Sequence, residues 1–423
     1  MEFKYSIIYF QSILLCLIPL ALLTGPFLPD LFLSIISICF LYLAITEKDW
    51  KYFKNLFFLI FSLFYLYLVL CSLLSENVSS SLRSSLFYFR FIIFSLAVWY
   101  IINNNKNILK IFTYSLLITF IFALLDGYLQ FFYSTGIFNI DSPNHRLTLL
   151  YDDKLILGGY LVRLFPLLIG LLIYNFEFTN KNIIFFAIIL IATEVLIYLS
   201  GERTAIALLA ILSLFLIFLI RRFKLIRIFT LILSISAIVF LTFNFPDVKN
   251  RNIGMTLYQL KPPNESIKIF SQTHDSLYKT AINIFSDNKF FGVGPNLFRD
   301  YCDMSEYMHS IKAYSCGTHP HNSYFQLLSE TGIFGFTIVF LIYIYLCWIC
   351  LLHLVNTYFI NKNSNFNYSQ LSDYQICLIG CFFLSLFPFL PTQDFFNNWI
   401  NVIFFLPVGF FLQSVYKSSN LKV

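Results

Sequence analysis

The 423-residue sequence carries little charge. Asp, Glu, Lys and Arg make up 12% of it, whereas about a quarter of a typical soluble domain is charged. The 53 Phe and 27 Tyr residues outnumber the 28 basic and 22 acidic residues together, and 58% of the chain is hydrophobic. This composition excludes a soluble enzyme, a disordered protein and a nucleic-acid-binding domain.

The sequence has instead a series of long apolar runs, and a membrane span needs about 20 such residues. The short alternating segments that are typical of a membrane β-barrel are missing. The sequence therefore predicts an all-α polytopic membrane protein. We expect about 12 transmembrane helices, at residues 5–24, 27–46, 55–74, 84–102, 108–133, 155–175, 182–199, 204–220, 225–243, 323–357, 373–391 and 395–416.

The chain then divides into three regions. Helices 1–9 occupy residues 1–243, a long polar loop occupies residues 244–322, and helices 10–12 occupy residues 323–423. The first apolar run has no small-residue cleavage site and is followed at once by a second run. We therefore expect it to be a membrane anchor and not a removed signal peptide.

The basic residues orient this bundle. Fourteen Lys and Arg, Arg227 among them, fall in the termini and short loops of one side, and six fall in the short loops and adjacent half-spans of the other side. Basic short loops mark the cytoplasmic side of a membrane. We expect a multi-pass membrane protein with both termini in the cytoplasm and the long loop on the outer side of the membrane. The net charge of +6 follows from the inward loops, so it indicates no nucleic-acid partner.

The long loop contains recognisable local structure, and loops of this length are often functional. Ser276–Asp287 has helical spacing and places Leu277, Ala281, Ile284 and Phe285 on one face, which predicts a helix lying on the membrane surface. Two cysteines lie in this oxidising compartment. They either form a disulfide or remain free thiols, and they are Cys302 and Cys316.

Few ionisable residues lie inside the predicted spans, and those few are candidates for function. Arg90, Asp126, Arg163 and Glu194 all fall in the outer half of the membrane, on the order of 10 Å below its outer surface. A charged cavity that opens only outward fits an enzyme acting on a lipid-linked anion better than it fits a transport pathway. The alternative is that Arg–Asp and Arg–Glu ion pairs lock the helices together, and the two interpretations are compatible.

Arginines also occur at the outward turns. Arg146 precedes the sixth span, and Arg203 begins the eighth span directly after a very short turn. The planar guanidinium suits a phosphate or pyrophosphate, and a helix N-terminus adds free N–H groups and a favourable dipole. The alternative for Arg203 is a side chain that extends to the lipid headgroups.

The most specific local pattern is Thr318-His319-Pro320-His321-Asn322. Pro favours the first helical position, so we expect Thr318 or His319 to cap the tenth span and His321 to lie in its first turn. The positive end of the helix disfavours a protonated imidazole, which makes His321 a candidate general base. Zinc binding lacks a third ligand with suitable spacing, and the remaining alternative is a pair of surface histidines.

These pieces together resemble a known family. The H-[N/S/Q]-x9-G-x-x-G signature of O-antigen ligases resembles His321-Asn322 followed, after nine residues, by Gly332-Ile333-Phe334-Gly335. The superfamily's G-V-G-x-x-x-F segment is similar to residues 292–298, its S-x-S-R-x-A turn to residues 200–205, and its R-x-x-G-x-F-x-N-P-N-x-x-G-x-Y-L stretch to residues 146–161. The resemblance to the O-antigen ligase/polymerase superfamily covers residues 140 to 340.

The resemblance implies a GT-C-like membrane glycosyltransferase of lipopolysaccharide biosynthesis. It would lie in the bacterial inner membrane, with the long loop and the active site in the periplasm. Its donor would be a glycan on undecaprenyl pyrophosphate and its acceptor a sugar hydroxyl of lipid A–core, with no nucleotide sugar, metal or other cofactor. Arg203 and Arg146 would hold the pyrophosphate, and His321 would take the acceptor proton. Asn322 and Gln326, four residues apart on one helix face, would orient a sugar or the base. Further candidates for substrate binding are His319, His274, Lys279, Arg299, Arg90 and Arg163.

The sequence departs from the family at two points. His274 stands where the family has an arginine four residues before an aromatic, here Tyr278, and Lys279, Lys268 and Arg299 are the candidates to replace that arginine. Residues 152–154 stand where the family has a D/N-P-N turn. The nearest alternative function is the polymerase, which extends lipid-linked repeats, and a protein O-oligosaccharyltransferase is a further relative. A transporter is disfavoured because no internal repeat is seen, and a structural scaffold would not need basic residues beside a histidine at the outer face.

Overall fold

The computed structural model describes residues 2–138, 147–148, 150, 156–177, 179–222, 224–261, 267, 269–358 and 370–419. The helices of the bundle are α1 (Glu2–Ala21), α2 (Phe27–Thr46), α3 (Leu56–Leu74), α4 (Val78–Ser85), α5 (Phe89–Asn104), α6 (Ile108–Tyr133), α7 (Leu157–Asn175), α8 (Asn180–Leu199), α9 (Arg203–Leu219), α10 (Lys224–Asn244), α16 (Ser323–Tyr358), α17 (Asp373–Ser385) and α18 (Asn398–Ser419). Short helices lie in the connections: η1 (Trp50–Phe53), α11 (Pro246–Lys249), the π-helical turn η3 (Asn250–Gly254), α12 (Met255–Leu260), α13 (Gln272–Asp287), α14 (Phe298–Tyr301) and α15 (Lys312–Ser315).

The apolar helices coincide with the predicted spans. Within the described ranges, ten helical segments are long and apolar enough to cross a membrane, and α9 and α17 are two shorter apolar helices at the remaining predicted positions. The prediction of an all-α polytopic membrane protein is confirmed. The predicted end of the eleventh span is wrong: α17 ends at Ser385 and not at 391. Pro388 and Pro391 lack the backbone N–H that would continue the helix.

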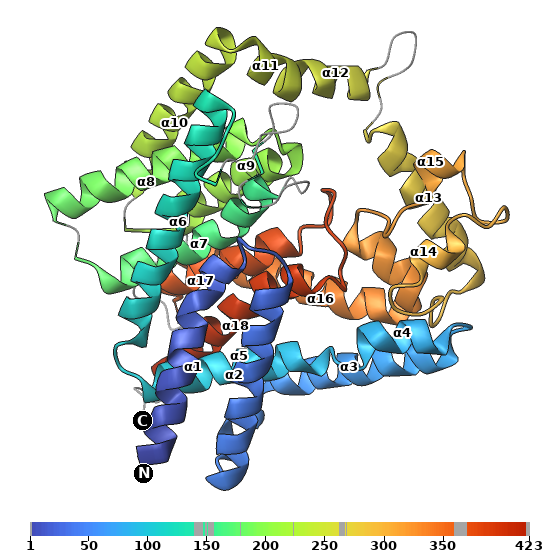
Figure 1. Ribbon diagram of the computed structural model, residues 1–423, viewed down its shortest axis with the longest axis horizontal. Coiled ribbons are helices and arrows are strands. Elements are labelled where there is room, and N and C mark those ends of the chain that lie inside the picture. Colours follow the sequence, from blue (N-terminus) through green and yellow to red (C-terminus); the bar gives the residue numbers. More distant parts are fainter. Residues whose placement is uncertain are drawn as a thin grey trace.

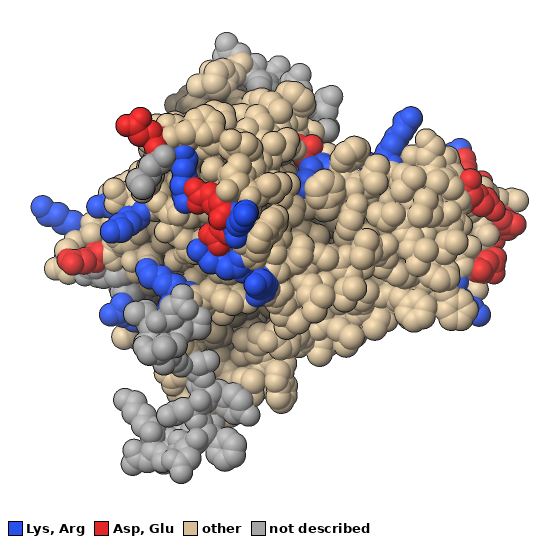
Figure 2. Space-filling model, turned by 90° about the horizontal axis from the view of Figure 1, so that it is seen from below, with Lys and Arg blue, Asp and Glu red and all other residues tan. Residues whose placement is uncertain are grey.

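The surface agrees with a membrane-embedded bundle. On the face shown in Figure 2, Lys, Arg, Asp and Glu gather toward the two ends and leave a broad zone between them with few charged side chains. Both chain termini are marked at the same end of the molecule in Figure 1, whereas α11 and α12 lie at the opposite end. The core of the bundle is formed by α5 and α7, most of whose residues are buried, and these helices pack against α18 and α17 respectively.

Two ion pairs lock helices together, as the alternative interpretation of the intramembrane charges expects. Arg90 of α5 pairs with Asp30 of α2 (2.9 Å). Arg227 of α10 pairs with Glu194 of α8, and its Nη2–H donates to Ser213 Oγ of α9 (2.9 Å). Both members of the second pair are almost fully buried. Each charge therefore requires the charged and hydrogen-bonding partners that it has here.

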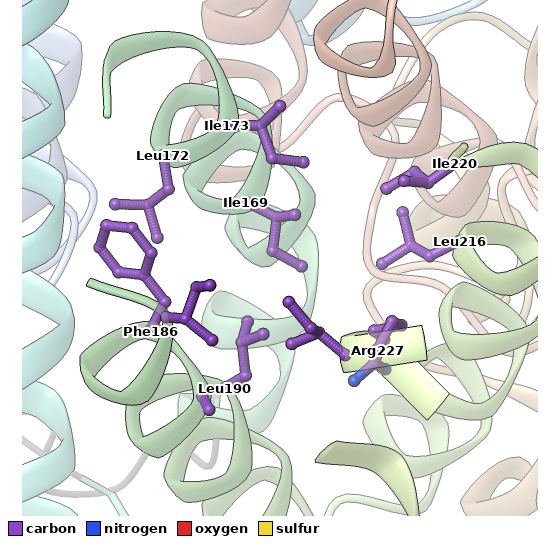
Figure 3. A pocket seen from close by; sticks show the side chains of 11 residues that line it. Ile169, Leu172, Ile173, Phe186, Leu190, Leu216, Ile220 and Arg227 are labelled. Carbon is purple, nitrogen blue, oxygen red and sulfur yellow. The ribbon is translucent and has the colours of Figure 1, made fainter. Parts of the chain in front are cut away.

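The position of Arg227 corrects the assignment of this residue to an inward loop. It lies within α10 and reaches an apolar pocket of about 60 Å³ lined by α7, α8 and α9 (Figure 3). The ion-pair interpretation pairs Asp126 with an arginine, but in the structure Asp126 has other partners. Its carboxylate accepts hydrogen bonds from the Ile137 backbone N–H (2.6 Å) and from Gln130 Nε2 (3.0 Å).

The long loop folds around a small core of its own. Leu277, Ala281 and Ile284 of α13 are buried against Val293, Leu297, Phe298 and Tyr301. The prediction of a helix on the membrane surface is therefore wrong, because other parts of the chain already cover the apolar face of α13. The Cα atoms of Cys302 and Cys316 lie 4.9 Å apart, and the two residues form a disulfide that closes this unit.

A backbone joint holds the loop against α16. Gly332 interrupts α16 with φ of +65°, and Gly292 has the same φ. A Cβ at Gly292 would lie 2.3 Å from the Glu330 carbonyl carbon, and a Cβ at Gly332 would lie 2.3 Å from the Phe290 backbone. Only glycine permits both the conformation and this approach. The two glycine motifs of the family resemblance are therefore the two halves of one structural contact.

The buried carboxylate of Glu330 completes the joint. It accepts hydrogen bonds from the backbone N–H groups of Asn296 (2.8 Å) and Phe298 (3.0 Å) and from Gln326 Nε2 (3.1 Å). The loop is therefore fixed relative to the start of α16 at Ser323, which lies seven residues before Glu330.

Candidate functional site

Helix α16 begins at Ser323, two residues after His321. Asn322 caps the helix, because its side-chain Oδ1 accepts hydrogen bonds from two backbone N–H groups of the first turn (2.9 and 3.3 Å). The predicted cap at Thr318 or His319 is wrong, since Asn is among the strongest capping residues and lies immediately before Ser323, the first helical residue. His321 consequently precedes the first turn.

The backbone of His321 is in the left-handed region, with φ of +54°. This conformation is uncommon outside glycine, and such residues cluster at functional sites. The segment after α17 holds it in place. The His321 carbonyl accepts a hydrogen bond from the Thr392 N–H (2.8 Å). The Asn322 amide donates to the carbonyls of Pro388 (2.9 Å) and Leu390 (3.3 Å). The side chain of His321 is left exposed.

Three imidazoles meet at this turn. The ring centroid of His321 lies 4.3 Å from that of His319 and 5.8 Å from that of His274, which belongs to α13. His319 Nδ1 lies 3.0 Å from Thr318 Oγ1. His274 Nδ1 lies 2.9 Å from the hydroxyl of Ser271, which also caps α13. Each of these two rings is thus oriented by a neighbouring hydroxyl.

The environment favours the neutral form of all three imidazoles. Burial, with a contribution from His321, lowers the pKa of His319 to about 4. Burial, His321 and Arg203 lower the pKa of His274 to about 4. The protein around His321 removes enough water to lower its pKa as well. A neutral imidazole can accept a proton at neutral pH, as a general base must.

His321 and His274 line a cavity of about 720 Å³. Three further cavities of the described structure measure only about 60 to 100 Å³. The cavity lies between the start of α9, the turns η3 and α12, the start of α13, and the segment after α17. Its wall combines polar and apolar side chains: Glu202, Arg203, Thr204, Arg251, Thr256, Gln259, Leu260, Ile269, Phe270, Ser271, His274, His321, Phe389, Leu390 and Pro391.

Arg203 is the first residue of α9 and lines this cavity. Its Nη1–H donates to Gln259 Oε1 (2.7 Å). The helix dipole opposes a cation at this end of a helix, so helix stability does not account for the position of Arg203. An anion bound between the guanidinium and the free N–H groups of the first turn would account for it.

Sequence reasoning missed Arg251 and Gln259. Both line the cavity, Arg251 from η3 and Gln259 from α12. The Nε–H of Arg251 donates to the Gly201 carbonyl (3.3 Å). No spacing signal separates these residues from the other polar residues of the long loop. They reach the site because α11, η3 and α12 continue from α10 and bring the chain back over the start of α9.

Asn322 and Gln326 stabilise the segments around the site without lining the cavity. Both are buried. Gln326 Nε2 donates to Asp394 Oδ1 (2.7 Å), and its Oε1 accepts from the Phe395 N–H (2.8 Å). The two side chains therefore hold residues 388–395 against α16, and neither is part of the cavity wall.

Two of the candidates to replace the loop arginine are engaged elsewhere. Lys279 pairs with Asp275 one turn away on α13 (2.8 Å). Arg299 donates to Asn296 Oδ1 (2.5 Å) and lies 3.7 Å from Asp394. Neither residue is part of the cavity wall.

The remaining candidates lie apart from the cavity wall or outside the described residues. Arg90 is held in its ion pair, and Arg163 is buried in α7 with its Nη1–H donating to the Gly159 carbonyl (3.1 Å). Arg146 and Lys268 lie outside the described residues. Of the predicted site residues, the structure thus brings Arg203, His274 and His321 to one cavity and places His319 beside it.

Within the described ranges, no group of three or more His, Cys, Asp and Glu side chains is arranged to hold a metal ion. The cavity instead presents two guanidinium groups, hydroxyls, an amide, a carboxylate and two imidazoles. This set can bind an oxyanion and can move a proton.

Comparison with known proteins relates this region of the chain to a family. No curated protein matches the chain. A family model described as O-antigen ligase matches residues 183–340, from the start of α8 to the middle of α16. The matched region contains every residue of the cavity wall except the three at 389–391. Residues 183–340 are therefore similar to the O-antigen ligase family.

Proposed function

We propose that the protein transfers a glycan from undecaprenyl pyrophosphate to a sugar hydroxyl of lipid A–core, at the periplasmic face of the inner membrane. The match of residues 183–340 to the O-antigen ligase model supports a function of the O-antigen ligase or polymerase type. The observation that carries the proposal is that Arg203 and His321, more than a hundred residues apart, line the same cavity. The guanidinium of Arg203 can bind a pyrophosphate, and the imidazole of His321 can accept a hydroxyl proton.

The reaction is a single displacement. The acceptor oxygen forms a bond to the anomeric carbon, and the bond from that carbon to the pyrophosphate oxygen breaks. The hydroxyl proton passes to His321, and undecaprenyl pyrophosphate leaves with the bonding electron pair. This path inverts the anomeric configuration.

Each side chain has a defined task in this step. Arg203 offers a planar set of N–H donors to the charge that grows on the leaving pyrophosphate. His321 is neutral before the reaction, because its environment lowers its pKa. His319 and His274 flank His321 and restrict its orientation, while Asn322 fixes the turn that presents it. Arg146 is a second candidate for the pyrophosphate, on the basis of the family resemblance alone.

Amphiphilic surroundings fit a lipid-linked donor. The cavity wall carries Leu260, Ile269 and Phe389 in addition to its polar groups. Ile269 and Phe389 are among the most exposed apolar side chains of the described structure. They offer a surface for the isoprenoid beside the site for its pyrophosphate.

Reconstitution with two acceptor arrangements tests the proposal. Purified protein in detergent, with no added metal or nucleotide, is mixed with an undecaprenyl-pyrophosphate glycan, with and without lipid A–core. Glycan on lipid A–core supports the ligase. Longer lipid-linked chains, formed without lipid A–core, would instead identify a polymerase that uses the same site. Absence of transfer in both mixtures contradicts the proposal and makes transport of the lipid-linked glycan the next function to test.

A further inference from the structure

We propose that Arg251, in the π-helical turn η3, is the second guanidinium that binds the pyrophosphate of the lipid-linked donor. The inference rests on the proposed function and adds a residue that the family signatures quoted above do not contain. It follows from the position of Arg251, from the charges around it and from the state of His274.

Arg251 is fixed close to Arg203. Its Nε–H donates to the carbonyl of Gly201, two residues before Arg203, and both arginines line the 720 Å³ cavity. Gly201 itself has a φ of +70°, a conformation that glycine adopts readily. The turn before α9 thus positions both guanidinium groups: Arg203 follows it in the chain, and Arg251 is hydrogen-bonded to it.

Neither guanidinium has a carboxylate partner in the described part of the chain. Arg203 donates to the neutral amide of Gln259, and Arg251 donates to a carbonyl. The half-buried positive charges lie near enough to disfavour one another. By contrast, Arg90 and Arg227 each have a carboxylate. Two half-buried cations with no such partner require an anion for neutralisation, and a cavity open to a ligand is where that anion can bind.

Two other ionisable groups of the wall leave the two arginines as described: His274 adds no positive charge, and Glu202 forms hydrogen bonds with other residues. The His274 imidazole is neutral near pH 7, because its pKa is about 4. The carboxylate of Glu202 accepts hydrogen bonds from the backbone N–H groups of Gly158 (2.7 Å) and Gly159 (3.0 Å) at the start of α7. Arg203 and Arg251 are therefore the fixed positive charges on the described cavity wall, and two planar donor groups match the two phosphates of a pyrophosphate.

Binding of two lipids to purified protein tests this assignment. The probes are undecaprenyl pyrophosphate and undecaprenyl monophosphate, and the variants are Arg251→Gln, Arg251→Lys and the matched control Lys249→Gln. Lys249 is exposed, lies two residues away and does not line the cavity. Melting temperatures of all variants show whether each is folded.

Arg251→Gln is expected to weaken pyrophosphate binding about 10- to 100-fold, because a charge-assisted bidentate contact is lost, and to weaken monophosphate binding less than about 3-fold. The affinity of Arg251→Lys for the pyrophosphate should lie between those of the wild type and Arg251→Gln, since lysine keeps the charge but lacks the planar set of N–H donors. Lys249→Gln should bind as the wild type does. Adding His274→Arg to Arg251→Gln should restore binding by at least about 10-fold, because it returns a guanidinium to the same cavity.

The outcomes separate this inference from the proposed function. Unchanged pyrophosphate binding by folded Arg251→Gln overturns the role of Arg251, even where glycan transfer by the wild type is demonstrated. Absence of pyrophosphate binding by the wild type overturns it also. Weakened pyrophosphate binding by Arg251→Gln alone, in a protein that transfers no glycan, supports Arg251 and rejects the transferase.

Discussion

The ring of His274 lies edge-on to the imidazole of His321, with the centroids 5.8 Å apart and the ring planes at 80°. His274 belongs to α13 of the long loop, whereas His321 lies two residues before α16. Their contact means that the loop forms one wall of the site. Whatever fixes the loop against α16 therefore also determines whether the site is complete.

The joint between the loop and α16 gives the first prediction. Gly292→Ala should lower the free energy of unfolding by about 1–3 kcal/mol or more, because the new Cβ meets the backbone of Glu330 and the residue has a positive φ. Thermal unfolding in detergent measures this. Gly317→Ala is the control, since its Cβ would meet nothing closer than 3.7 Å. Equal melting temperatures for the two variants would contradict the joint.

The disulfide gives the second prediction. Cys302→Ser should destabilise the loop by about 3 kcal/mol, the value expected for closing a loop of this length. A reductant should lower the wild-type melting temperature to the same extent and should leave that of Cys302→Ser unchanged. A wild-type protein that melts identically with and without reductant would show that the bond does not stabilise the loop.

The pH dependence of transfer gives the third prediction. A general base must be neutral, so activity falls as the pH drops through the pKa of His321. Desolvation lowers that pKa, so the acid limb of kcat/KM should have its midpoint below about 6.5, the usual value for histidine. A profile from about pH 4.5 to 8 measures it. A midpoint at or above neutral pH would argue against a neutral His321 in the free protein.

Arg203 gives the fourth prediction. Arg203→Gln should reduce kcat/KM at least about 100-fold, because it removes a contact to the leaving pyrophosphate. Arg203→Lys should retain part of the activity, since an ammonium keeps the charge without the bidentate geometry. Arg222→Gln, an exposed residue outside the cavity wall, should transfer as the wild type does. Normal transfer by Arg203→Gln would remove this residue from the mechanism.

The sequence predicts the helices of this protein better than their contacts. Long apolar runs locate the spans because a membrane requires internal backbone hydrogen bonding. Hydropathy and charge alone place Arg227 in an inward loop, because they do not reveal its partner Glu194 on another helix. Likewise, periodicity shows that one face of α13 is apolar but not what covers that face.

The same limit applies to the site: motifs identify some of its residues, and only the tertiary structure identifies the others. Arg203, His274 and His321 could be found because each occupies a recognisable place in a motif. Arg251 could not, because it reaches the cavity only through the path of α11, η3 and α12 back toward α9. Gln326 could be selected by its spacing from Asn322, but its hydrogen bonds to Asp394 and Phe395 depend on tertiary structure.

The most direct test of the account compares His321→Ala with His309→Ala. His309 is an exposed histidine of the same loop and serves as the matched control. Glycan transfer from undecaprenyl pyrophosphate to lipid A–core is measured at equal amounts of folded protein. His321→Ala should lose transfer by about 100- to 10,000-fold, whereas His309→Ala should transfer as the wild type does. Wild-type transfer by folded His321→Ala would contradict the assignment of His321 as the base.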